Sequence, residues 1–365
     1  MVSDDGGTPD PAAARRGFSR PARLVDLAEH SGYSIKTVSR VLNNEPYVSD
    51  RTRSEVWKAV EELGYVADNR ARSLRTAGSR SGYVGLIVPD MRNGFFAELA
   101  NAVEKRIGAA GQTLLLGISD ESTAKEAKYL DVFRQNRIDM LMAVPAGSDA
   151  LARFSEQVPT VVLDRMQPGL EGVADFVTAN NRESARALTA HLIRAHRLER
   201  VIMVAGEKEI SSVRERQAGY YDAMAEAGLT PIVSDEHLTL ADAEAGAIQA
   251  MRSLATPFGV FATGSRMYWG AMSAAARLGK VVPRDLAAVT FDGSGNLGVA
   301  GPLPTQAQLP VKAMVARAFQ LVTERALEPD REPRTVTVEC DIEYGMTCGC
   351  MDLTGSGPLV VRTGR

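Results

Sequence analysis

Segment 24–43, LVDLAEHSGYSIKTVSRVLN, carries basic and hydroxylated side chains at a spacing suited to binding a polyanion. Lys36 and Arg40 are four residues apart, so a helix would place them on one face. An arginine can donate two parallel hydrogen bonds to guanine, which discriminates between bases by about 1–3 kcal/mol, whereas hydroxyl groups suit phosphate contacts that fix register. The residues expected to reach base edges or phosphates are Ile35, Lys36, Thr37, Ser39, Arg40 and Asn43.

Two helices and a tight turn must position these side chains. Ala28 is small enough for a close helix crossing, Gly32 can adopt the positive φ of a tight turn, and Ser34 can cap the second helix. The apolar periodicity also predicts a third helix that ends at Gly64. These features predict a helix-turn-helix whose second helix enters the major groove; a protein-binding helical hairpin is the alternative. The residues expected to form the shared core are Leu24, Leu27, Tyr33, Val38, Val41, Val56, Ala59, Val60 and Leu63.

The net charge of −3 is unevenly distributed along the 365 residues. Residues 15–80 contain 13 Lys and Arg against 8 Asp and Glu, whereas the rest of the chain is acidic. A basic segment on an acidic body fits the prediction of a polyanion partner. No run of about 18 apolar residues occurs, and the N-terminus lacks the apolar core of a signal peptide. We therefore expect no membrane span and a cytoplasmic location.

Beyond residue 80, short apolar runs alternate with amphipathic stretches. This alternation predicts two α/β subdomains, each a doubly wound parallel sheet covered by helices on both faces. A ligand would bind at the carboxyl ends of the strands, in the cleft between the subdomains. The predicted strands are 83–88, 113–118, 140–144, 160–164, 200–205, 258–263 and 286–291, and the predicted helices are 96–110, 123–135, 183–195, 212–227, 241–254 and 267–278.

The pattern LxDxAxxxGxSxxTVSRVLN strongly resembles the opening of the LacI/GalR (lactose-repressor) family of bacterial regulators. The resemblance continues through VSDRTRSEVWKAVEELGY (48–65), ARSLR (71–75), GLIVPDMRNGFFAEL (85–99) and VPRDLAAVTFD (282–292), and it covers about residues 21–345. It implies a homodimeric transcriptional regulator, most often a repressor, that binds a pseudo-palindromic DNA operator. It also implies a hinge in which Leu74, flanked by Arg72 and Arg75, wedges into the minor groove and kinks the duplex.

The family core resembles periplasmic sugar-binding proteins, which implies a small-molecule effector held between the two subdomains. By motif, the effector-binding residues implied are Asp90, Phe95, Asp164, Arg216 and Asp292. Their carboxylate, guanidinium and aromatic groups suit hydroxyl-bearing or planar ligands.

This chain departs from the family pattern on one side of the expected effector site. Gly264-Ser265 replaces the Asn-Asp pair of many members, and Tyr268-Trp269 is bulkier than the usual Ala-Leu. Ser265 and Trp269 are therefore added to the effector-binding candidates, and the expected effector is a sugar or another metabolite. A regulator with a degenerate pocket, independent of any effector, is the alternative within the family.

The expected organisation is a disordered arm (1–20), a helix-turn-helix domain (21–64), a hinge (65–80), an α/β core (81–350) and a flexible tail (351–365). Within the core, one subdomain is expected to combine about 81–179 with 305–333, and the other about 180–304 with 334–350. The tail carries no leucine heptads, so we expect a dimer rather than a coiled-coil tetramer. By resemblance, its interface lies along Phe96–Ala110 and the corresponding part of the second subdomain.

Other patterns that could carry chemistry are weaker. Residues 293–298 spell G-x-G-x-x-G, but the sequence after them is not the helix that a dinucleotide site needs. The spacing of Cys340, Cys348 and Cys350 fits neither C-x-x-C nor a zinc pattern, so these cysteines are expected to be reduced and structural. No nucleophile, Walker or metalloprotease motif occurs, which predicts no enzyme, no cofactor and no metal. A transport solute-binding protein is disfavoured by the N-terminal helices and the missing signal sequence.

Overall fold

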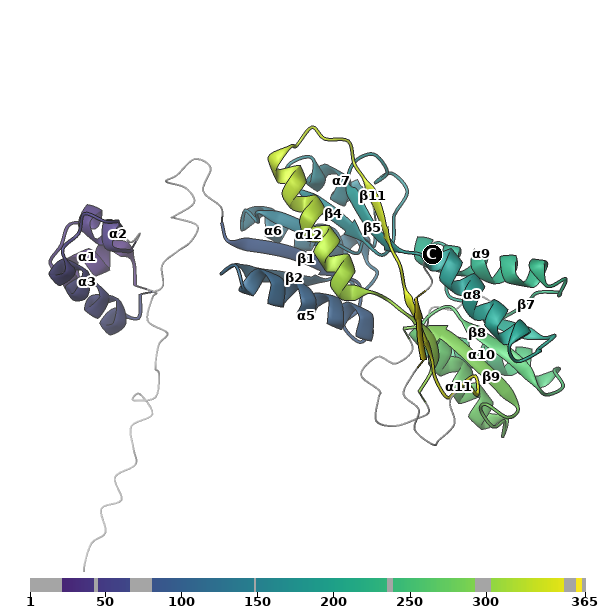
Figure 1. The fold of residues 1–365 in the computed structure, drawn as a ribbon. Helices are drawn as coiled ribbons and strands as arrows, with labels where there is room; N and C mark the ends of the chain where they lie inside the picture. The colour runs from purple at the N-terminus through teal and green to yellow at the C-terminus, as the bar shows by residue number, and fades with distance from the viewer. Residues whose placement is uncertain are drawn as a thin grey trace, which may run out of the picture. The chain divides into compact units, whose positions relative to one another are not determined.

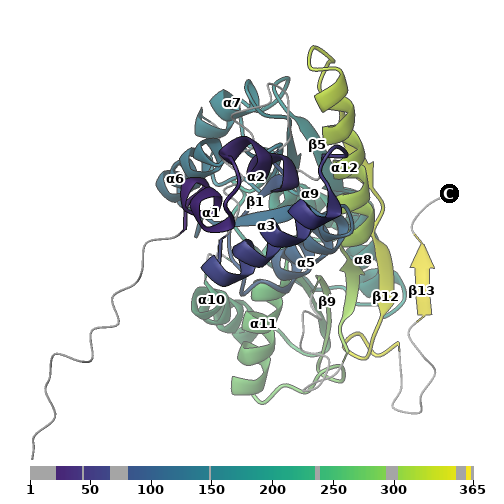
Figure 2. The ribbon, with the colours of Figure 1, turned by 90° about the vertical axis from the view of Figure 1, so that its left-hand side faces the viewer.

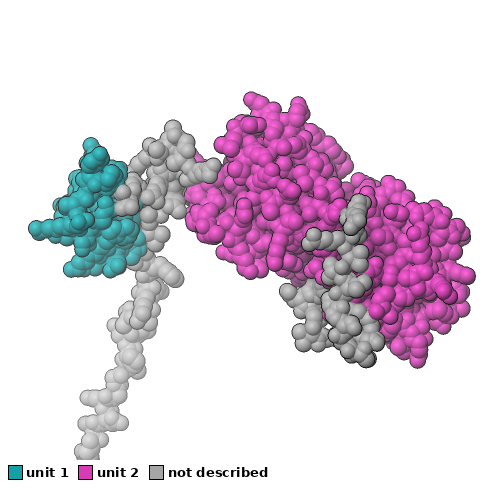
Figure 3. All heavy atoms as spheres, in the orientation of Figure 1, with its two compact units in different colours: residues 1–79 teal, residues 80–365 magenta. Residues whose placement is uncertain are grey.

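The computed structural model describes residues 22–42, 45–65, 81–147, 149–234, 239–292, 303–350 and 359–362. The chain divides into two compact units, residues 1–79 and residues 80–365 (Figures 1 and 3). No described helix is both long enough and apolar enough to cross a membrane.

The first unit is built from three helices, α1 (Leu24–Ser31), α2 (Ile35–Leu42) and α3 (Asp50–Leu63). Gly32 has φ 72° in the turn between α1 and α2. Residues that carry a Cβ atom rarely adopt this left-handed conformation, whereas glycine adopts it readily. The Oγ of Ser34 accepts a hydrogen bond of 3.2 Å from the backbone N–H of Thr37, as expected of a helix cap. The fully enclosed core consists of Leu27, Ala28, Val38, Val41, Val56 and Ala59, with Leu24, Tyr33, Val60 and Leu63 partly buried around it.

The second unit contains two sheets. The first has the strand order β11-β5-β4-β3-β1-β2, and all of its pairings are parallel. Alternate residues of a strand point to opposite faces, so Leu86 and Val88 pack under α5 and α12 whereas Ile87 packs under α6 and α7. Its elements are β1 (Tyr83–Val88), α5 (Gly94–Gly108), β2 (Thr113–Ile118), α6 (Thr123–Gln135), β3 (Met140–Ala143), α7 (Asp149–Ser155), β4 (Thr160–Leu163), β5 (Asp175–Ala179), α12 (Val311–Leu327) and β11 (Thr335–Val338).

The second sheet has the order β13-β12-β10-β9-β8-β6-β7. It is parallel from β7 to β10, but β12 and β13 are antiparallel additions at one edge, visible side by side in Figure 2. Helices α8 and α9 pack on one face, and α10 and α11 on the other. Its elements are α8 (Asn181–Arg194), β6 (Val201–Val204), α9 (Ser211–Glu226), β7 (Ile232–Val233), α10 (Leu240–Arg252), β8 (Phe258–Ala262), α11 (Ser265–Arg277), β9 (Leu286–Phe291), β10 (Thr305–Gln308), β12 (Asp341–Tyr344) and β13 (Leu359–Arg362). The predicted α/β class with two mostly parallel subdomains is therefore confirmed.

Three segments cross between the subdomains, at 179–181, 308–311 and 338–341. The first and third are hydrogen-bonded to each other, because the N–H of Asn180 donates to the carbonyl of Val338 (3.0 Å) and the N–H of Cys340 donates to Asn180 Oδ1 (2.8 Å). The backbone and the side-chain amide of Asn180 thus hold two crossings together.

The structure corrects the expected boundaries of the subdomains and of the tail. β10 belongs to the second sheet and β11 to the first, so the crossings lie near residues 309 and 340 rather than 305 and 334. Both strands are four residues long and partly polar, so their sequence does not reveal which sheet they join. Residues 359–362 of the expected flexible tail form β13, which pairs with β12. The expected disordered arm lies outside the described residues, as does nearly all of the hinge.

Asp175, at the start of β5, ties α12 and the segment after it to the first sheet. Its side chain is fully buried and accepts hydrogen bonds from Arg325 Nε (2.7 Å), an Arg331 terminal nitrogen (2.8 Å) and the N–H of Arg334 (2.8 Å). Burial raises the pKa of Asp175, but these hydrogen bonds outweigh it, so the pKa lies below its usual value. The carboxylate is therefore charged and fully partnered at neutral pH.

Replacing Asp175→Asn should lower the free energy of unfolding by about 3 kcal/mol, because two arginines would remain buried without a counter-charge. Urea denaturation at neutral pH measures this loss. Asp222→Asn is the matched control: Asp222 binds Arg182 with two hydrogen bonds at the surface, where the loss should be at most about 1 kcal/mol. Equal losses in the two variants would contradict the assignment of Asp175 as the buried anchor.

Candidate functional site

Helix α2 of the first unit buries only Val38 and Val41 completely. The side chains of Ile35, Lys36 and Arg40 are exposed, and those of Thr37 and Ser39 are half-buried. Ile35 is 45% exposed although it is apolar, so packing in the core of this unit does not explain why an apolar side chain stands at this position. An exposed apolar group at the start of a recognition helix suits contact with a thymine methyl group.

The polar side chains predicted to contact DNA also lie on α2. Arg40 Nε lies 3.5 Å from Glu45 Oε2, a half-exposed ion pair that costs little to exchange for a base or phosphate. Asn43, Arg72, Leu74 and Arg75 lie outside the described residues, so their roles stay predictions.

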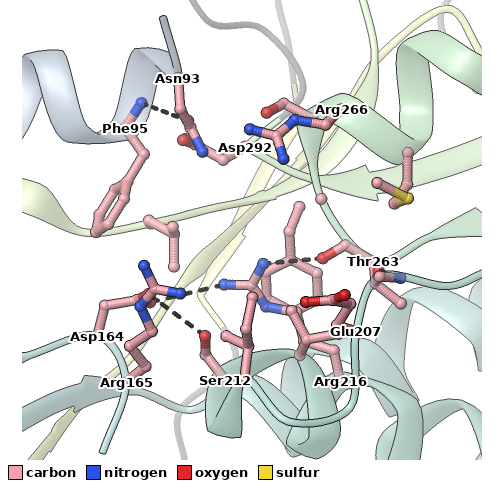
Figure 4. Close-up of a pocket in the computed structure, with 18 of the residues that line it drawn as sticks. Asn93, Phe95, Asp164, Arg165, Glu207, Ser212, Arg216, Thr263, Arg266 and Asp292 are labelled. Carbon is pink, nitrogen blue, oxygen red and sulfur yellow. Dashed lines mark hydrogen bonds and ion pairs between the residues drawn. The ribbon is translucent and has the colours of Figure 1, made fainter. Parts of the chain in front are cut away.

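A pocket lies between the two subdomains of the second unit, at the carboxyl ends of their strands (Figure 4). Its cavity volume is about 130 Å³, below the roughly 300–1,000 Å³ of typical small-molecule sites, so it suits a compact ligand. Phe95 and Phe96 from α5 give it an apolar wall, and polar groups converge on it from both subdomains. The polar lining includes Asn93, Glu121, Asp164, Arg165, Glu207, Ser212, Arg216, Thr263, Ser265, Arg266 and Asp292.

Arg216 on α9 is a buried cation of this pocket. Its Nε donates to Asn181 Oδ1 (2.8 Å), one terminal nitrogen donates to the carbonyl of Thr263 (2.9 Å), and the guanidinium lies 4.2 Å from the ring centroid of Phe291. Burial lowers the pKa of Arg216, and the nearby carboxylate of Asp164 opposes that effect. The other terminal nitrogen is 4.0 Å from Asp164 Oδ1, too far for a hydrogen bond.

Two carboxylates face Arg216 from the ends of strands in different subdomains. Asp164 directly follows β4 with φ 65°, and Asp292 directly follows β9 with φ 48°. Left-handed backbone at residues other than glycine is strained, and such strain concentrates at binding sites. The N–H of Asp164 donates to Val177, and that of Asp292 donates to Ala307, so the neighbouring strands hold both turns in place.

The electrostatics of these two carboxylates differ from those of surface aspartates. Burial raises the pKa of Asp164, and Arg216 and Arg165 only partly offset it. Its Oδ1 is buried and accepts no hydrogen bond from the described residues. Burial likewise raises the pKa of Asp292 to about 6. An acceptor oxygen next to a guanidinium with a spare donor is an arrangement that a ligand hydroxyl or carbonyl can complete.

Polar contacts also bridge the two subdomains around the pocket. Asp90, after β1, is 3.2 Å from a terminal nitrogen of Arg266 on α11. Ser212 Oγ donates to Asp164 Oδ2 over 3.3 Å, and the N–H of Met166 donates to Ser211 Oγ over 2.9 Å. These contacts depend on the distance between the subdomains, so a ligand that changes this distance changes them.

The structure brings Phe95, Asp164, Arg216, Ser265 and Asp292 into one pocket lining. The other two predicted residues lie elsewhere. Asp90 is held by Arg92 and by Arg266, which itself lines the pocket, and Trp269 packs beside Tyr268 against the core under α11.

Sequence reasoning missed Arg165, Arg266 and the acidic Glu121 and Glu207 in the lining. Arg165 directly follows Asp164, so its position just after the end of a strand could have predicted its place in the pocket lining. Arg266 had no such signal, because its position follows from its pairing with Asp90, 176 residues earlier in the chain.

A helix-turn-helix unit and a two-subdomain binding core on one chain define the class of DNA-binding transcriptional regulators. Residues 23–68 match the model of the bacterial regulatory proteins of the lacI family, and residues 189–348 match that of the periplasmic binding protein-like domain. The ribose operon repressor of Halalkalibacterium halodurans is 32% identical over 304 residues, which are 83% of this chain and 89% of that protein. The chain belongs to the lacI family of bacterial regulatory proteins.

Further similarities extend over most of the chain. The HTH-type transcriptional repressor PurR of Erwinia tasmaniensis is 31% identical over 327 residues, or 87% of this chain and 94% of that protein. The structure of the lac repressor dimer bound to operator and the anti-inducer ONPF has a TM-score of 0.76 at 19% identity, covering 90% of this chain and 99% of that one. The latter likeness establishes the shared fold.

Asp292 should make stability depend on pH in the acid range. Its folded pKa of about 6 exceeds the ordinary value of 3.8, so the folded state holds the proton more tightly. Its contribution is therefore fully present below about pH 3.8 and is lost as the pH rises through about 6. We expect a loss on the order of 1–2 kcal/mol across this window, absent in Asp292→Asn, measured as unfolding free energy against pH.

Asp285→Asn is the control for this pH profile. Arg284 holds the pKa of Asp285 at about 2, so Asp285 is ionised throughout the same window, and its variant should keep the wild-type slope. Parallel profiles for wild type and Asp292→Asn would show that the carboxyl of Asp292 titrates normally.

Proposed function

We propose that the protein is a transcriptional repressor that binds a pseudo-palindromic operator as a homodimer, with an affinity set by a small-molecule effector in the pocket between its subdomains. The relatives named as repressors, and the family membership, support the regulatory role. The effector role is carried by one observation: the buried guanidinium of Arg216, together with the unsatisfied Asp164 Oδ1, faces an open pocket.

On the DNA side, the N-terminal part of α2 enters the major groove. Arg40 reads a guanine, Ile35 and Lys36 approach base edges, and Thr37 and Ser39 contact phosphates. Asn43 adds a polar contact at the end of this segment. Leu74, with Arg72 and Arg75 beside it, wedges into the minor groove at the operator centre.

On the effector side, the ligand is a compact metabolite with several hydroxyl or carbonyl groups. One hydroxyl donates to Asp164 Oδ1 and accepts from Arg216, so that the two groups share a single ligand atom. Phe95 and Phe291 supply apolar faces for a ring, Asp292 accepts or donates according to its protonation, and Ser265 adds a hydroxyl. Such a ligand could be a sugar, but the carboxylate that many relatives carry at position 265 is replaced here by a hydroxyl.

Effector binding works by closing the two subdomains on each other. Asp90–Arg266 and Ser212–Asp164 already bridge the subdomains, so a ligand that pulls Arg216 and Asp164 together shifts the same equilibrium. A coupling free energy of about 1–3 kcal/mol between pocket and operator is typical of such switches. The protein acts in the cytoplasm, where its operator is, and its chemistry is binding rather than catalysis.

Arg40→Ala should weaken binding to an operator, identified by in-vitro selection from random DNA, by about 10-fold to 100-fold, and should relax the selection at one position in each half-site. Fluorescence anisotropy and a repeated selection measure the two effects. Lys58→Ala is the control, since Lys58 is an exposed cation on α3 that pairs with Glu62. Unchanged sequence preference in Arg40→Ala would remove Arg40 from base recognition.

Asp164→Asn should weaken effector binding by about 10-fold to 100-fold, because a hydrogen bond to a charged acceptor is lost. Isothermal titration calorimetry with a panel of sugars, nucleobases and small carboxylic acids first finds the compound that binds the wild type, and then compares the variant. Binding of the variant to operator in the absence of effector should stay within about two-fold. If no compound binds and cell metabolites leave operator binding unchanged, the chain is an effector-independent regulator instead.

A further inference from the structure

Four potential metal ligands meet on the second subdomain, and none of them lines the effector pocket. The side-chain nitrogens of His191 and His196 and the sulfurs of Cys348 and Cys350 all lie within 4.8 Å of one another. The two histidine Nε2 atoms are 3.1 Å apart, and Cys350 Sγ lies 3.2 Å from the first and 3.3 Å from the second. We propose that these four residues bind one zinc ion.

The three separations among His191, His196 and Cys350 fit a tetrahedral site, and Cys348 Sγ lies within 4.8 Å of each of these ligand atoms. Zinc bonds of about 2.0 Å to nitrogen and 2.3 Å to sulfur place tetrahedral ligand atoms about 3.3 Å apart for two nitrogens, 3.5 Å for nitrogen and sulfur, and 3.8 Å for two sulfurs. The observed nitrogen–nitrogen and nitrogen–sulfur separations lie within about 0.3 Å of these values. Two imidazoles and two sulfurs are also the donor set that selects zinc.

The fold prepares this geometry from two distant parts of the chain. His191 lies in the last turn of α8, which ends at Arg194, and His196 follows two residues later. Cys348 and Cys350 lie in the turn after β12, where Gly349 has φ 90°. The spacing between the histidines falls within the H-x₃₋₅-H range of zinc sites, whereas Cys-x-Cys is shorter than usual, which is why the cysteines alone suggested no metal.

The turn that carries the cysteines is fixed to the sheet. Thr347 Oγ1 donates to the carbonyl of Ala288 (2.8 Å) and accepts from the N–H of Thr305 (2.9 Å). At Gly345 an added Cβ would come within 2.3 Å of the carbonyl oxygen of Leu303, so the backbones approach as closely as glycine permits. Because this turn is held firmly, both sulfurs are already in place, and little conformational entropy is lost when an ion binds.

The surroundings favour a thiolate-bound cation. Thr305 Oγ1 donates toward Cys348 Sγ over 2.9 Å, the kind of outer contact that supports a metal ligand. The ring of Tyr344 covers His191 at a centroid distance of 4.6 Å. The partial negative charge at the C-terminal end of α8 also attracts a cation. Cys348 is buried and Cys350 exposed, so solvent reaches the site from one side.

Zinc binding here would displace the two thiol protons, and the two thiolates would neutralise the ion. The ion would join the end of α8 to the turn that follows β12. Helix α8 and strand β12 each begin at a crossing between the subdomains, at Asn181 and Asp341. The site therefore joins two elements that start at crossings, at the ends of these elements that lie away from the crossings.

The test uses the full-length protein without a polyhistidine tag, stripped with chelator and reloaded with zinc under reducing conditions. Elemental analysis of the desalted wild type should give one zinc ion per chain, and competition with a chromophoric chelator gives its affinity. The double variant His191→Gln, His196→Gln and the single variant Cys350→Ser should bind zinc at least about 100-fold more weakly, since even outer contacts contribute 10-fold to 100-fold. Cys340→Ser is the matched control, because Cys340 is buried outside the cluster and its variant should keep the zinc.

Cobalt substitution of the wild type gives a readout that needs no variant. Tetrahedral visible bands together with a thiolate-to-cobalt charge-transfer band are expected. Equal zinc content in wild type and the histidine double variant would overturn the proposal. Cobalt bound without the thiolate band would overturn it as well, as would a Cys348–Cys350 disulfide that persists under reduction and excludes zinc.

Discussion

The pocket between the two subdomains is organised around the buried guanidinium of Arg216. The guanidinium of Arg216 cannot leave water without partners, and the partners it finds lie on separate elements: the first crossing at Asn181, the end of β8 at Thr263 and the ring of Phe291 on β9. Its nearest carboxylate, Asp164, belongs to the opposite subdomain and remains 4.0 Å away. The same side chain thus contacts the crossing, the sheet edge and the cleft. Any change in the distance between the subdomains is a change in the solvation and pairing of this cation.

Much of this architecture could be predicted from the sequence, because buried parallel strands are continuous apolar runs. The bounds of β1, β2 and β9 were predicted to the residue, and six helices to within a few residues. Strands such as β10 (TQAQ) and β12 (DIEY) were missed, because strands of four residues with several polar side chains carry no periodic signal. Helix α12 was missed too, although it is 17 residues long. The pairing of β11 with β5 joins residues about 160 positions apart and has no local signature.

The candidate pocket was predictable in outline for a related reason. Aspartates that directly follow apolar strands gather at one edge of parallel sheets, and this rule finds Asp164 and Asp292. It fails for Arg266, whose place depends on a distant partner, and for Trp269, whose bulk is absorbed by the core under α11. The His–Cys cluster shows the same limit. In the sequence, the histidine pair and the cysteine pair each supply only two of the four ligands that a zinc ion needs. Only the packing of α8 against the end of the second sheet brings the two pairs together. Spacing predicts ligands on one element but not those that meet across the fold.

The path of the chain between the two subdomains also determines the order in which its parts can fold during synthesis. The first sheet receives its edge strand β11 only at residues 335–338, and α12, which covers one of its faces, is made at 311–327. On the ribosome, residues 81–179 therefore emerge with an open sheet edge and an uncovered apolar face, and they must wait for nearly the whole second subdomain. The helix-turn-helix, whose contacts are all local, is complete long before that point. A nascent chain can thus have a finished DNA-reading unit while the part that would regulate it is still unfolded.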